Sequence, residues 1–443
     1  MRTVYLPLEI FTRELKGKIL LAIKLAVQNY QVEIGYNQII RKRALEAEDS
    51  GIYFEIKGKS PKGMAYLDHL SEKGFKIVGQ DEESGITYFH FDDFLKNRPE
   101  ARNINDYDAF FTWGKSDFDH YKRIETKTDT VVNTGSPRTI LWQPKARSLY
   151  ETEINQIHQK YSKYTLFVSN LAGIVNLMPP RQMQKMTDNH GYDHEFWKYY
   201  SRRLDWEKHA LETTLRIIKN LSRENTQNIV FRPHPSENAE YWRSRFKKLN
   251  NVYVNKKGDT SSWIHAAEKV IHAGSTTAIE SYLSGVPTYS FQQEVNFQDC
   301  IMTPNLIGGQ LLIINDEIKL LNGNDNTVFA KDTLDTKISN LNSTLSLEVI
   351  SRKIIEISEG KKKFNKEYSI MERKAYSDYS TRIMDILKYG RSKNELLHRE
   401  KRPPISEFMF INMVNDLCKF IGVENRFIIK QTAESSFVIR LQN

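Results

Sequence analysis

Short apolar segments alternate with longer amphipathic segments along the first 300 residues of the chain. In the first half, the apolar segments have the length of β-strands, and stretches with helical spacing separate them. They lie at residues 4–8, 32–36, 51–56, 76–79, 109–113 and 131–133. Strands joined by helices of this length are typical of βαβ units, which build a parallel sheet. The alternation therefore predicts an α/β fold.

The alternation stops at residues 144–150 and then starts again. Strand-length segments of the second half lie at residues 166–169, 229–232, 252–254, 270–273 and 287–291. Two successive halves of this kind predict two Rossmann-like domains, at residues 1–150 and 151–345, that face a central cleft. Extra C-terminal helices are expected at residues 346–390, packed on the two domains. A basic C-terminal appendage is expected at residues 391–443.

Composition narrows the class of protein. The chain has 443 residues, of which 40% are hydrophobic and 27% charged, which excludes a disordered or fibrous protein. The two cysteines, Cys300 and Cys418, are too few for a disulfide framework or a Cys-based zinc site. No run of about 18 apolar residues is present, and the first residues lack the pattern of a signal peptide. We expect a cytoplasmic protein.

Positive charge exceeds negative charge, with 64 Lys and Arg against 55 Asp and Glu. Residues 355–443 hold 17 basic and 12 acidic side chains, together with Phe408, Phe410, Phe420 and Phe427. A basic region with aromatic side chains can bind acidic partners or lie against an anionic membrane face, and the second interpretation predicts a peripheral contact with the inner membrane. Solvated helix surfaces would give the same composition. Nucleic acid is not expected as a partner, because the charge is not concentrated in the half that carries the motifs.

The segment Arg232-Pro233-His234-Pro235-Ser236-Glu237 directly follows a predicted strand. Ligands of open α/β sheets bind at the carboxyl ends of the strands, in the loops that lead into helices. Arg232 and His234 together make a small cationic site for a phosphate group. The two prolines restrict the backbone around His234 and hold its ring. A structural histidine bonded to a local carbonyl group is the alternative.

A second segment, VIHAGSTTAIES at residues 270–281, has the pattern of a strand, a glycine turn and a helix. It places Ser275, Thr276 and Thr277 at the start of the helix, where free N–H groups favour an anion. N-capping by Ser275 alone is the alternative, although capping requires one hydroxyl group and not three. Glu280 follows one turn later and is placed to accept hydrogen bonds from ribose.

The two segments together resemble the nucleotide-binding half of GT-B glycosyltransferases. The order of MRTVYLPLEIFTREL at the N-terminus, FTWG at residues 111–114, NTGSPR at 133–138, FRPHPSE and IHAGSTTAIES resembles the bacterial surface carbohydrate biosynthesis proteins. That group is similar to CMP-Kdo transferases, polysialyltransferases and teichoic-acid glycerophosphotransferases in its His-Pro and Ser/Thr motifs. The resemblance covers residues 1–300 and implies a GT-B fold and a role in capsule or lipopolysaccharide assembly.

The resemblance also implies roles for individual residues. In relatives that use CMP-activated acidic sugars, the histidine of the His-Pro motif contacts the nucleotide phosphate and assists the leaving group. This role falls on His234, and Arg232 shares the charge. The hydroxyl cluster of these relatives binds phosphate, which implies the same for residues 275–277. The glutamate that holds ribose in GT-B enzymes corresponds to Glu280.

An acidic group, Asp81-Glu82-Glu83, follows the predicted strand KIVGQ of the first half and looks like the acidic motif of the same family. Neighbouring like charges raise the pKa of one carboxyl group, which is what a general base requires. We therefore expect Asp81 and Glu82 to be catalytic. A solvated acidic turn is the alternative.

Three further residues lie at strand or helix ends that should face the cleft: Glu9, Arg13 and Arg138. They are expected to bind the acceptor or the carboxylate of an acidic sugar, with Arg13 or Arg138 as the cation.

No metal and no cofactor are expected. The DxD patterns at Asp106–Asp108 and Asp117–Asp119 match a metal-binding motif of other glycosyltransferases, but such patterns are common by chance. The chain lacks GxGxxG and GxxxxGK[ST], which argues against a dinucleotide oxidoreductase and a P-loop NTPase.

The leading interpretation is a metal-independent GT-B glycosyltransferase that transfers Kdo or a nonulosonate from a CMP-activated donor to a glycan acceptor, which is lipid-linked in the favoured case. Three activities on the same fold stay open as alternatives: UDP-sugar transfer, nucleotide-sugar 2-epimerisation and glycerophosphate transfer. A non-catalytic protein that binds nucleic acid through the basic tail is the alternative from another class.

Overall fold

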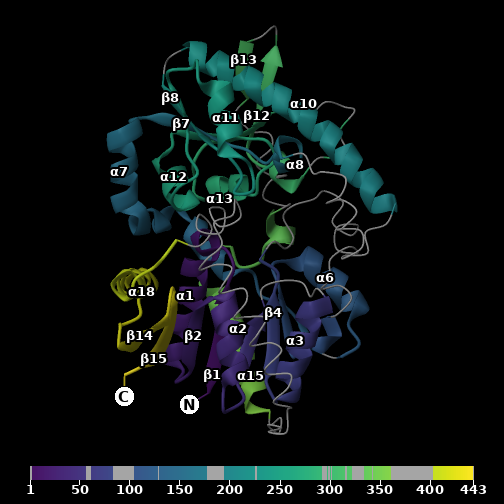
Figure 1. Ribbon diagram of the computed structural model, residues 1–443, viewed down its shortest axis with the longest axis vertical. Helices are drawn as coiled ribbons and strands as arrows, with labels where there is room; N and C mark the ends of the chain where they lie inside the picture. The colour runs from purple at the N-terminus through teal and green to yellow at the C-terminus, as the bar shows by residue number, and fades with distance from the viewer. Residues whose placement is uncertain are drawn as a thin grey trace. The chain divides into compact units, whose positions relative to one another are not determined.

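The computed structural model of the chain describes residues 2–55, 61–82, 104–127, 129–176, 194–224, 227–291, 297, 300, 302–314, 317–321, 334–341, 343–360 and 403–442. The chain divides into two compact units. The first unit contains Met1–Gly85, Asp92–Leu141 and Asp335–Asn443, and the second contains Ile86–Phe91 and Trp142–Leu334. Each unit is built around one β-sheet with helices packed on it (Figure 1). The α/β class predicted from the sequence is confirmed.

The sheet of the first unit has the order β14-β15-β2-β1-β3-β4-β5-β6. Its six parallel strands are β1 (Thr3–Leu8), β2 (Gln31–Tyr36), β3 (Ile52–Glu55), β4 (Lys76–Gln80), β5 (Ala109–Thr112) and β6 (Val131–Asn133). The strands are almost entirely buried, as expected for parallel strands covered on both faces. Pro7 is tolerated in β1 because the pairing with β3 ends at Tyr5, so its missing N–H leaves no unsatisfied partner there.

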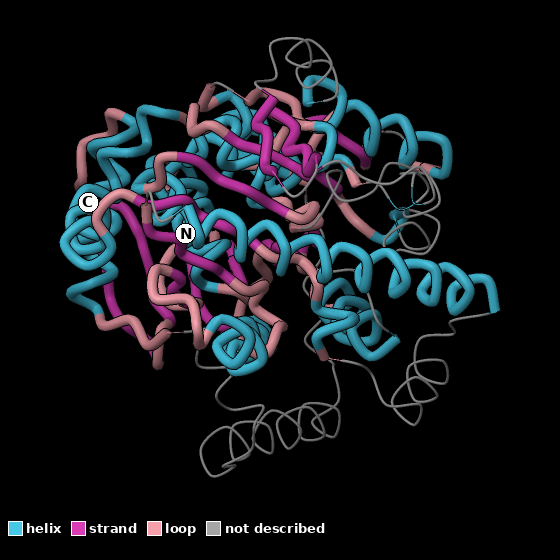
Figure 2. The backbone as a smooth tube through the Cα atoms, turned by 90° about the horizontal axis from the view of Figure 1, so that it is seen from above, coloured by secondary structure: helices cyan, strands magenta, loops and turns pink. Residues whose placement is uncertain are grey.

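Helices of the first unit connect its parallel strands. They are α1 (Phe11–Val27), α2 (Asn37–Glu46), α3 (Pro61–Glu72) and α6 (Lys115–Ile124). The chain moves one way from β1 to β2 and the opposite way from β2 to β3. Because such crossovers are right-handed, α1 and α2 lie on opposite faces of the sheet. The strands, drawn in magenta, therefore run between layers of helices (Figure 2).

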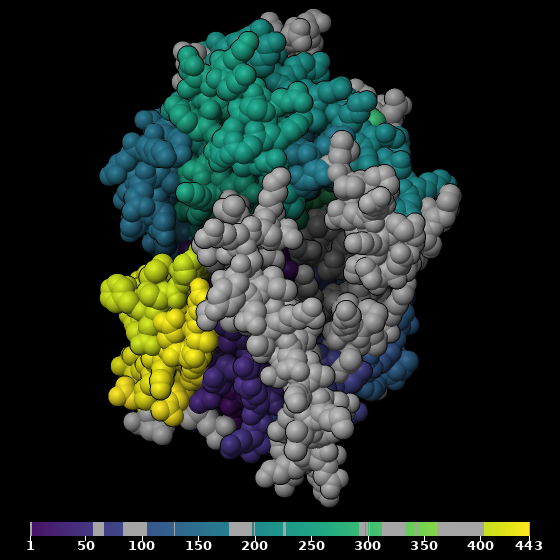
Figure 3. All heavy atoms as spheres, in the orientation of Figure 1, coloured from purple at the N-terminus to yellow at the C-terminus, as the bar shows by residue number. Residues whose placement is uncertain are grey.

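C-terminal elements complete the first unit. The helices α15 (Leu345–Glu359) and α18 (Glu407–Ile421) both pack on α1. The hairpin of β14 (Phe427–Ala433) and β15 (Ser436–Leu441) joins the sheet, since β15 pairs antiparallel with β2. In the space-filling view, this yellow segment lies beside the purple N-terminal residues (Figure 3). Residues 403–442 are thus part of the first unit. The sequence instead predicts that they belong to a separate appendage.

The sheet of the second unit has the order β13-β12-β11-β10-β7-β8-β9. Its strands are β7 (Tyr164–Val168), β8 (Asn228–Arg232), β9 (Val252–Val254), β10 (Lys269–His272), β11 (Thr288–Phe291), β12 (Gly309–Ile314) and β13 (Glu317–Leu321). All neighbours are parallel except β12 and β13.

Helices of the second unit are α7 (Glu151–Tyr161), α8 (Ala172–Val175), α10 (His194–Glu224), α11 (Ala239–Phe246), α12 (Thr260–Ala266) and α13 (Thr277–Leu283), preceded by the 3-10 turn η3 (Pro144–Tyr150). A large apolar cluster includes Phe167 and Phe231 of the sheet, Trp206 of α10 and Trp242 of α11. This cluster packs against β7 and β8, whose carboxyl ends lead into the loops described below.

Among the described residues, no helix combines the length and the apolar character that a membrane span needs.

Candidate functional site

The strand order of the second unit identifies where a ligand is expected to bind. From β7 the chain moves to β8 and β9 on one side, and it later returns to β10 on the other side of β7. The order in which the chain adds strands to the sheet therefore reverses between β7 and β10. In open α/β sheets, ligands bind outside the carboxyl ends of the strands at such a switch point. The residues that follow β7, β8 and β10 form the candidate site of this unit.

Hydrogen bonds join these three loops. The N–H of Ser169, after β7, donates to the carbonyl oxygen of Arg232 at 3.0 Å. The side chain of Asn170 donates to the carbonyl oxygen of Gly274, after β10, at 3.1 Å. The carboxyl group of Glu237 accepts from the Ser169 hydroxyl at 2.9 Å and from the Leu171 N–H at 2.6 Å. The loops are thereby fixed relative to one another.

The ring of His234 is held from one side. Its Nδ1 lies 2.6 Å from the Ser236 hydroxyl and 3.3 Å from the Ser236 N–H. A backbone N–H can only donate, so Nδ1 is the acceptor and the neutral ring carries its proton on Nε2. His234 is half-buried at the carboxyl edge of the sheet. This arrangement makes Nε2–H a donor suited to an anionic oxygen.

Arg232 has a different environment from the one its motif suggests. Its guanidinium donates to the carbonyl oxygens of Lys257 at 2.8 Å and Gly258 at 3.1 Å, and its centre lies 5.2 Å from the ring centroid of Trp263. Burial lowers the pKa of Arg232 to about 10, although nearby Tyr164, Asp259 and other groups act in the opposite direction. The side chain therefore stabilises the loop after β9 through these hydrogen bonds. A contact of Arg232 with phosphate stays a prediction.

The hydroxyl cluster lies at the start of α13. Ser275 is buried and its hydroxyl accepts from the N–H of Thr277 at 3.3 Å, whereas Thr276 is exposed. The helix has seven residues, so an anion here would be bound by hydroxyl and N–H groups more than by a helix dipole. Glu280 is 8% exposed and accepts a hydrogen bond from the Ser261 hydroxyl of α12. Its role in binding ribose also stays a prediction.

His272, the last residue of β10, is fully buried at the same edge. Its Nδ1 accepts the N–H of Gly274 at 3.1 Å, and its Nε2 has no hydrogen-bond partner among the described residues. Burial lowers the pKa of His272 to about 3, so the ring is neutral at physiological pH. It supports the turn that leads to Ser275.

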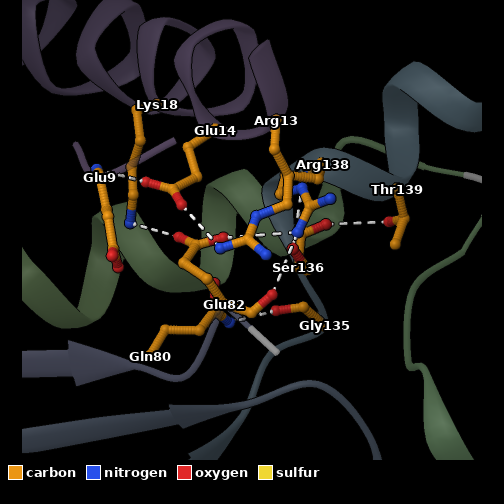
Figure 4. Close-up of polar contacts among 10 residues, drawn as sticks. All are labelled: Glu9, Arg13, Glu14, Lys18, Gln80, Glu82, Gly135, Ser136, Arg138 and Thr139. Atoms are coloured by element: carbon orange, nitrogen blue, oxygen red, sulfur yellow. Dashed lines mark hydrogen bonds and ion pairs between the residues drawn. The ribbon is translucent and has the colours of Figure 1, made fainter. Parts of the chain in front are cut away.

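The predicted residues of the first unit meet at the carboxyl edge of its sheet (Figure 4). Lys18 and Glu82 form an ion pair at 2.9 Å, and Arg138 lies 3.7 Å from the same carboxylate. Arg13 pairs with Glu14 at 2.9 Å, and Glu14 also accepts the N–H of Glu9 at 2.8 Å. Figure 4 shows α1 supplying three of these side chains, which converge on Glu82 and Arg138.

The sequence predicts a raised pKa for one carboxyl group of the acidic motif, and Glu82 is not that group. Burial acts to raise the pKa of Glu82, but the charges of Lys18 and Arg138 outweigh it and hold this pKa below its usual range. Burial raises the pKa of Glu14 despite the neighbouring Arg13. The carboxyl group with a raised pKa is therefore Glu14 and not Glu82. A carboxylate with a lowered pKa is a weaker base.

The other predicted residues of this edge have distinct surroundings. Asp81 follows β4 directly and is buried. Arg138 donates to the carbonyl oxygen of Glu82 at 3.1 Å and lies over the ring of Trp113. The side chain of Arg13 is 26% exposed, which makes it more accessible than Lys18 or Arg138. Glu83 lies outside the described residues.

The aspartates of the DxD patterns have structural contacts. Asp108 pairs with Lys76 at 3.2 Å and accepts the N–H of Ile77 at 2.8 Å. Asp117 accepts the N–H groups of Trp113 and Gly114, both at 2.9 Å, at the start of α6. In the part of the chain that the structure describes, no group of three or more potential metal ligands comes together.

Sequence reasoning missed three residues: Glu14, Lys18 and Glu237. Glu14 and Lys18 were detectable, because they are spaced by four and fall on the same face of α1 as its apolar residues. Glu237 belongs to the RPHPSE motif, but nothing in its local pattern shows that it is buried.

No protein-family model and no curated protein matches the chain. Among solved structures, it is similar to a complex of S. aureus MnaA with UDP, at 11% identity and a TM-score of 0.45, covering 83% of this chain and 100% of the other. It is also similar to a UDP-GlcNAc 2-epimerase from Methanocaldococcus jannaschii, at 12% identity and a TM-score of 0.48, covering 81% and 100%. The wall teichoic acid polymerase TagF matches at 10% identity and a TM-score of 0.40, covering 86% and 89%.

Proposed function

We propose that the chain is a metal-independent GT-B glycosyltransferase of bacterial surface polysaccharide assembly. It transfers an acidic sugar, Kdo or a nonulosonate, from a CMP-activated donor to a glycan acceptor. The observation that carries the proposal is the joining of the loops after β7, β8 and β10 at the switch point, where Ser236 bonds Nδ1 of His234 and so leaves the ring proton on Nε2. The preference for CMP over UDP rests on the motif resemblance.

In this proposal the second unit binds the nucleotide. His234 donates its Nε2–H to a phosphate oxygen and stabilises the charge that develops on the leaving nucleotide. Ser275 and Thr277 bind phosphate oxygens through hydroxyl and N–H groups, and Glu280 accepts from ribose. The first unit binds the acceptor and the sugar carboxylate, with Arg13 as the more accessible cation.

The base that removes a proton from the acceptor is proposed among the carboxyl groups of the first unit. Asp81 is favoured over Glu82, because Glu82 is neutralised by Lys18 and Arg138. Glu14 is the additional candidate, since its pKa is raised by burial.

Calorimetric titration with CMP, CDP, UDP and GDP tests the nucleotide assignment. CMP is expected to bind the wild-type protein, and His234→Ala is expected to lose at least tenfold in affinity. His158→Ala is the matched control, because His158 bonds the carbonyl oxygen of Ala266, which precedes β10 and so lies at the opposite edge of the sheet. Selective binding of UDP would overturn the CMP assignment, and equal affinity in both variants would remove His234 from the site.

Three alternatives on the same fold predict different products. A UDP-sugar transferase should bind UDP selectively, and a 2-epimerase should convert the donor without an acceptor. A glycerophosphotransferase should prefer CDP-glycerol and release CMP. Incubation of the protein with each donor, in the presence and absence of acceptor, separates these activities.

A peripheral membrane contact is proposed through α18, where Phe408 and Met409 are 73% and 47% exposed. Residues 403–442 carry four basic and four acidic side chains, so this segment adds no net electrostatic attraction. Binding of vesicles through it should depend on Phe408 and not on the fraction of anionic lipid. Cosedimentation of wild type and Phe408→Ser with neutral and anionic vesicles tests this contact, and equal pelleting of both proteins would contradict it.

A further inference from the structure

Glu237 is an acidic residue buried in the loop after β8, with 1% of its surface exposed. Its Oε1 accepts from the Ser169 hydroxyl and the Leu171 N–H, both after β7. Its Oε2 accepts from the indole N–H of Trp242 in α11 at 2.7 Å. One side chain therefore connects the loops after β7 and β8 to the helix that follows. All three donors therefore have a hydrogen-bond acceptor in the protein interior.

The same loop contains His234, and the backbone couples the two residues. The N–H of Glu237 donates to the carbonyl oxygen of His234 at 2.8 Å, which closes a turn. Within this turn, Ser236 presents its N–H and hydroxyl to Nδ1 of His234. A displacement of Glu237 would move Ser236, and Ser236 sets the tautomer and direction of the ring.

The remaining carbonyl groups of the turn are also satisfied. Lys256 donates to the carbonyl oxygens of Pro235 and Glu237, both at 3.0 Å. The side chain of Asn176, after β7, donates to the carbonyl oxygen of Ser236 at 2.5 Å. These contacts hold the outside of the turn, and the Glu237 carboxyl group holds its inside. A turn fixed from both sides keeps its side chains in one arrangement.

We propose that Glu237 is the positioning residue of His234: its buried carboxyl group locks the turn between the two loops, so that Nε2–H of His234 keeps one direction. The inference concerns the ring geometry in the protein without ligand. Its consequence for nucleotide binding rests on the proposed function. The two can therefore be tested separately.

Glu237→Gln is the sharpest variant. A carboxyl group offers two acceptor oxygens to three donors, whereas an amide offers one oxygen and two N–H donors. If the amide oxygen of the glutamine accepts from Ser169 and Leu171, the amide NH₂ group faces the indole N–H of Trp242. Two donors then face each other, and no hydrogen bond can form between them. Glu240→Gln is the matched control, because Glu240 lies three residues later and its side chain is 75% exposed.

NMR of protein labelled with ¹⁵N-histidine reports the ring directly, with the His234 signal assigned by His234→Gln. The wild type and Glu240→Gln are expected to show one neutral tautomer with the proton on Nε2. Glu237→Gln is expected to show an exchanging mixture of tautomers. An unchanged His234 signal in folded Glu237→Gln would overturn the proposal. If Glu237→Gln does not fold, Ser169→Ala takes its place. It removes one of the three donors to Glu237 and leaves the other two hydrogen bonds in place. The His234 ring of Ser169→Ala is expected to show the same mixture of tautomers.

The functional consequence is measured by titration of CMP into the same variants. Glu237→Gln should bind CMP at least tenfold more weakly, and Glu240→Gln should stay within twofold of wild type. A lost affinity with an unchanged ring signal would refute positioning through His234. If the wild type binds none of CMP, CDP, UDP and GDP, the proposed function fails, and the ring signal alone decides the role of Glu237.

Discussion

The ammonium nitrogen of Lys18 lies 2.9 Å from a carboxylate oxygen of Glu82, and the two side chains are only 4% and 5% exposed. Lys18 comes from the middle of α1, and Glu82 is the second residue after β4. Transfer of both charges from water to this interior is costly, and the cost is offset only while each charge has its partner. The pair therefore ties α1 to the carboxyl edge of the sheet at the site where the sequence predicts a general base.

Removal of one partner from this pair should destabilise the first unit. Lys18→Met leaves the Glu82 carboxylate buried with Arg138 as its remaining cation, so the free energy of unfolding is expected to fall by about 3 kcal/mol. The double variant Lys18→Met/Glu82→Met should lose less, because the Glu82 carboxylate is then no longer buried without Lys18. Arg138 loses its ion pair with Glu82 but keeps its hydrogen bond to the carbonyl oxygen of residue 82. Urea unfolding followed by circular dichroism measures both. A double variant less stable than Lys18→Met would contradict this account.

His272 should make the second unit less stable at acidic pH. Its folded pKa of about 3 lies below the ordinary value of 6.5, so the unfolded chain binds a proton that the folded protein excludes. This contribution is complete above pH 6.5 and is lost as the pH falls toward 3. The loss should amount to about 2 kcal/mol between pH 6.5 and 5.

The variant His272→Asn tests this dependence, because its side-chain carbonyl can accept the Gly274 N–H but does not titrate. The difference in unfolding free energy between wild type and variant should shrink as the pH is lowered from 7.5 to 5. A difference that is constant over this range would show that burial does not depress the pKa of His272.

Glu237 should produce a pH dependence of the opposite sign. Burial raises its pKa from 4.5 to about 7, although the Leu171 N–H, the Ser169 hydroxyl and the Trp242 indole all favour the charged form. The folded state then binds more protons than the unfolded state between pH 4.5 and 7. Its contribution to stability is complete below pH 4.5 and is lost as the pH rises through 7, by up to about 3 kcal/mol.

Unfolding of wild type and Glu237→Gln at pH 5 and pH 8 measures this contribution, with Glu240→Gln as the control. The wild type should lose more stability than Glu237→Gln between the two values. If it loses the same or less, the three hydrogen bonds dominate over burial and the carboxyl group is ionised throughout.

The alternation of apolar segments identifies all six parallel strands of the first sheet, because each buried strand is a short run of mainly apolar and β-branched residues. The same reasoning could not place β15. Its partner is β2, and the paired residues Phe437 and Ile34 come from opposite ends of the sequence. Such pairings depend on the folded context and leave no local pattern in the sequence.

The sequence predicts only part of the site, and the reason is similar. The position of His234 after β8 follows from the strand and loop pattern. The partners of Arg232 could not be inferred, because they are carbonyl groups of a loop that is distant in sequence. Acidic neighbours predict a raised pKa for one carboxyl group of the motif, but the sequence does not show that Lys18 and Arg138 lower the pKa of Glu82.

The C-terminal segment should be required for the stability of the first unit. Phe410 of α18 stacks on Phe437 of β15, with ring centroids 3.9 Å apart, and both are fully buried. Phe437→Ala is expected to lower the unfolding free energy by about 3–5 kcal/mol. Phe408→Ala is the matched control, because Phe408 is 73% exposed and should change stability by less than about 0.5 kcal/mol. Equal melting temperatures of the two variants would show that the segment contributes nothing to this unit.

Arg232 offers a test between a structural and a ligand-binding cation. Its guanidinium donates to carbonyl oxygens of Lys257 and Gly258, and a lysine cannot reproduce this fork. Arg232→Lys should therefore lower the unfolding free energy by about 1.5–3 kcal/mol, the range for a hydrogen bond to a charged group. Arg243→Lys, at an exposed position of α11, should have little effect. Below the melting temperature, CMP affinity should change far less in Arg232→Lys than in His234→Ala. Should Arg232→Lys keep its stability but lose nucleotide affinity, Arg232 binds phosphate as the motif predicts, and its contacts with the loop after β9 are secondary.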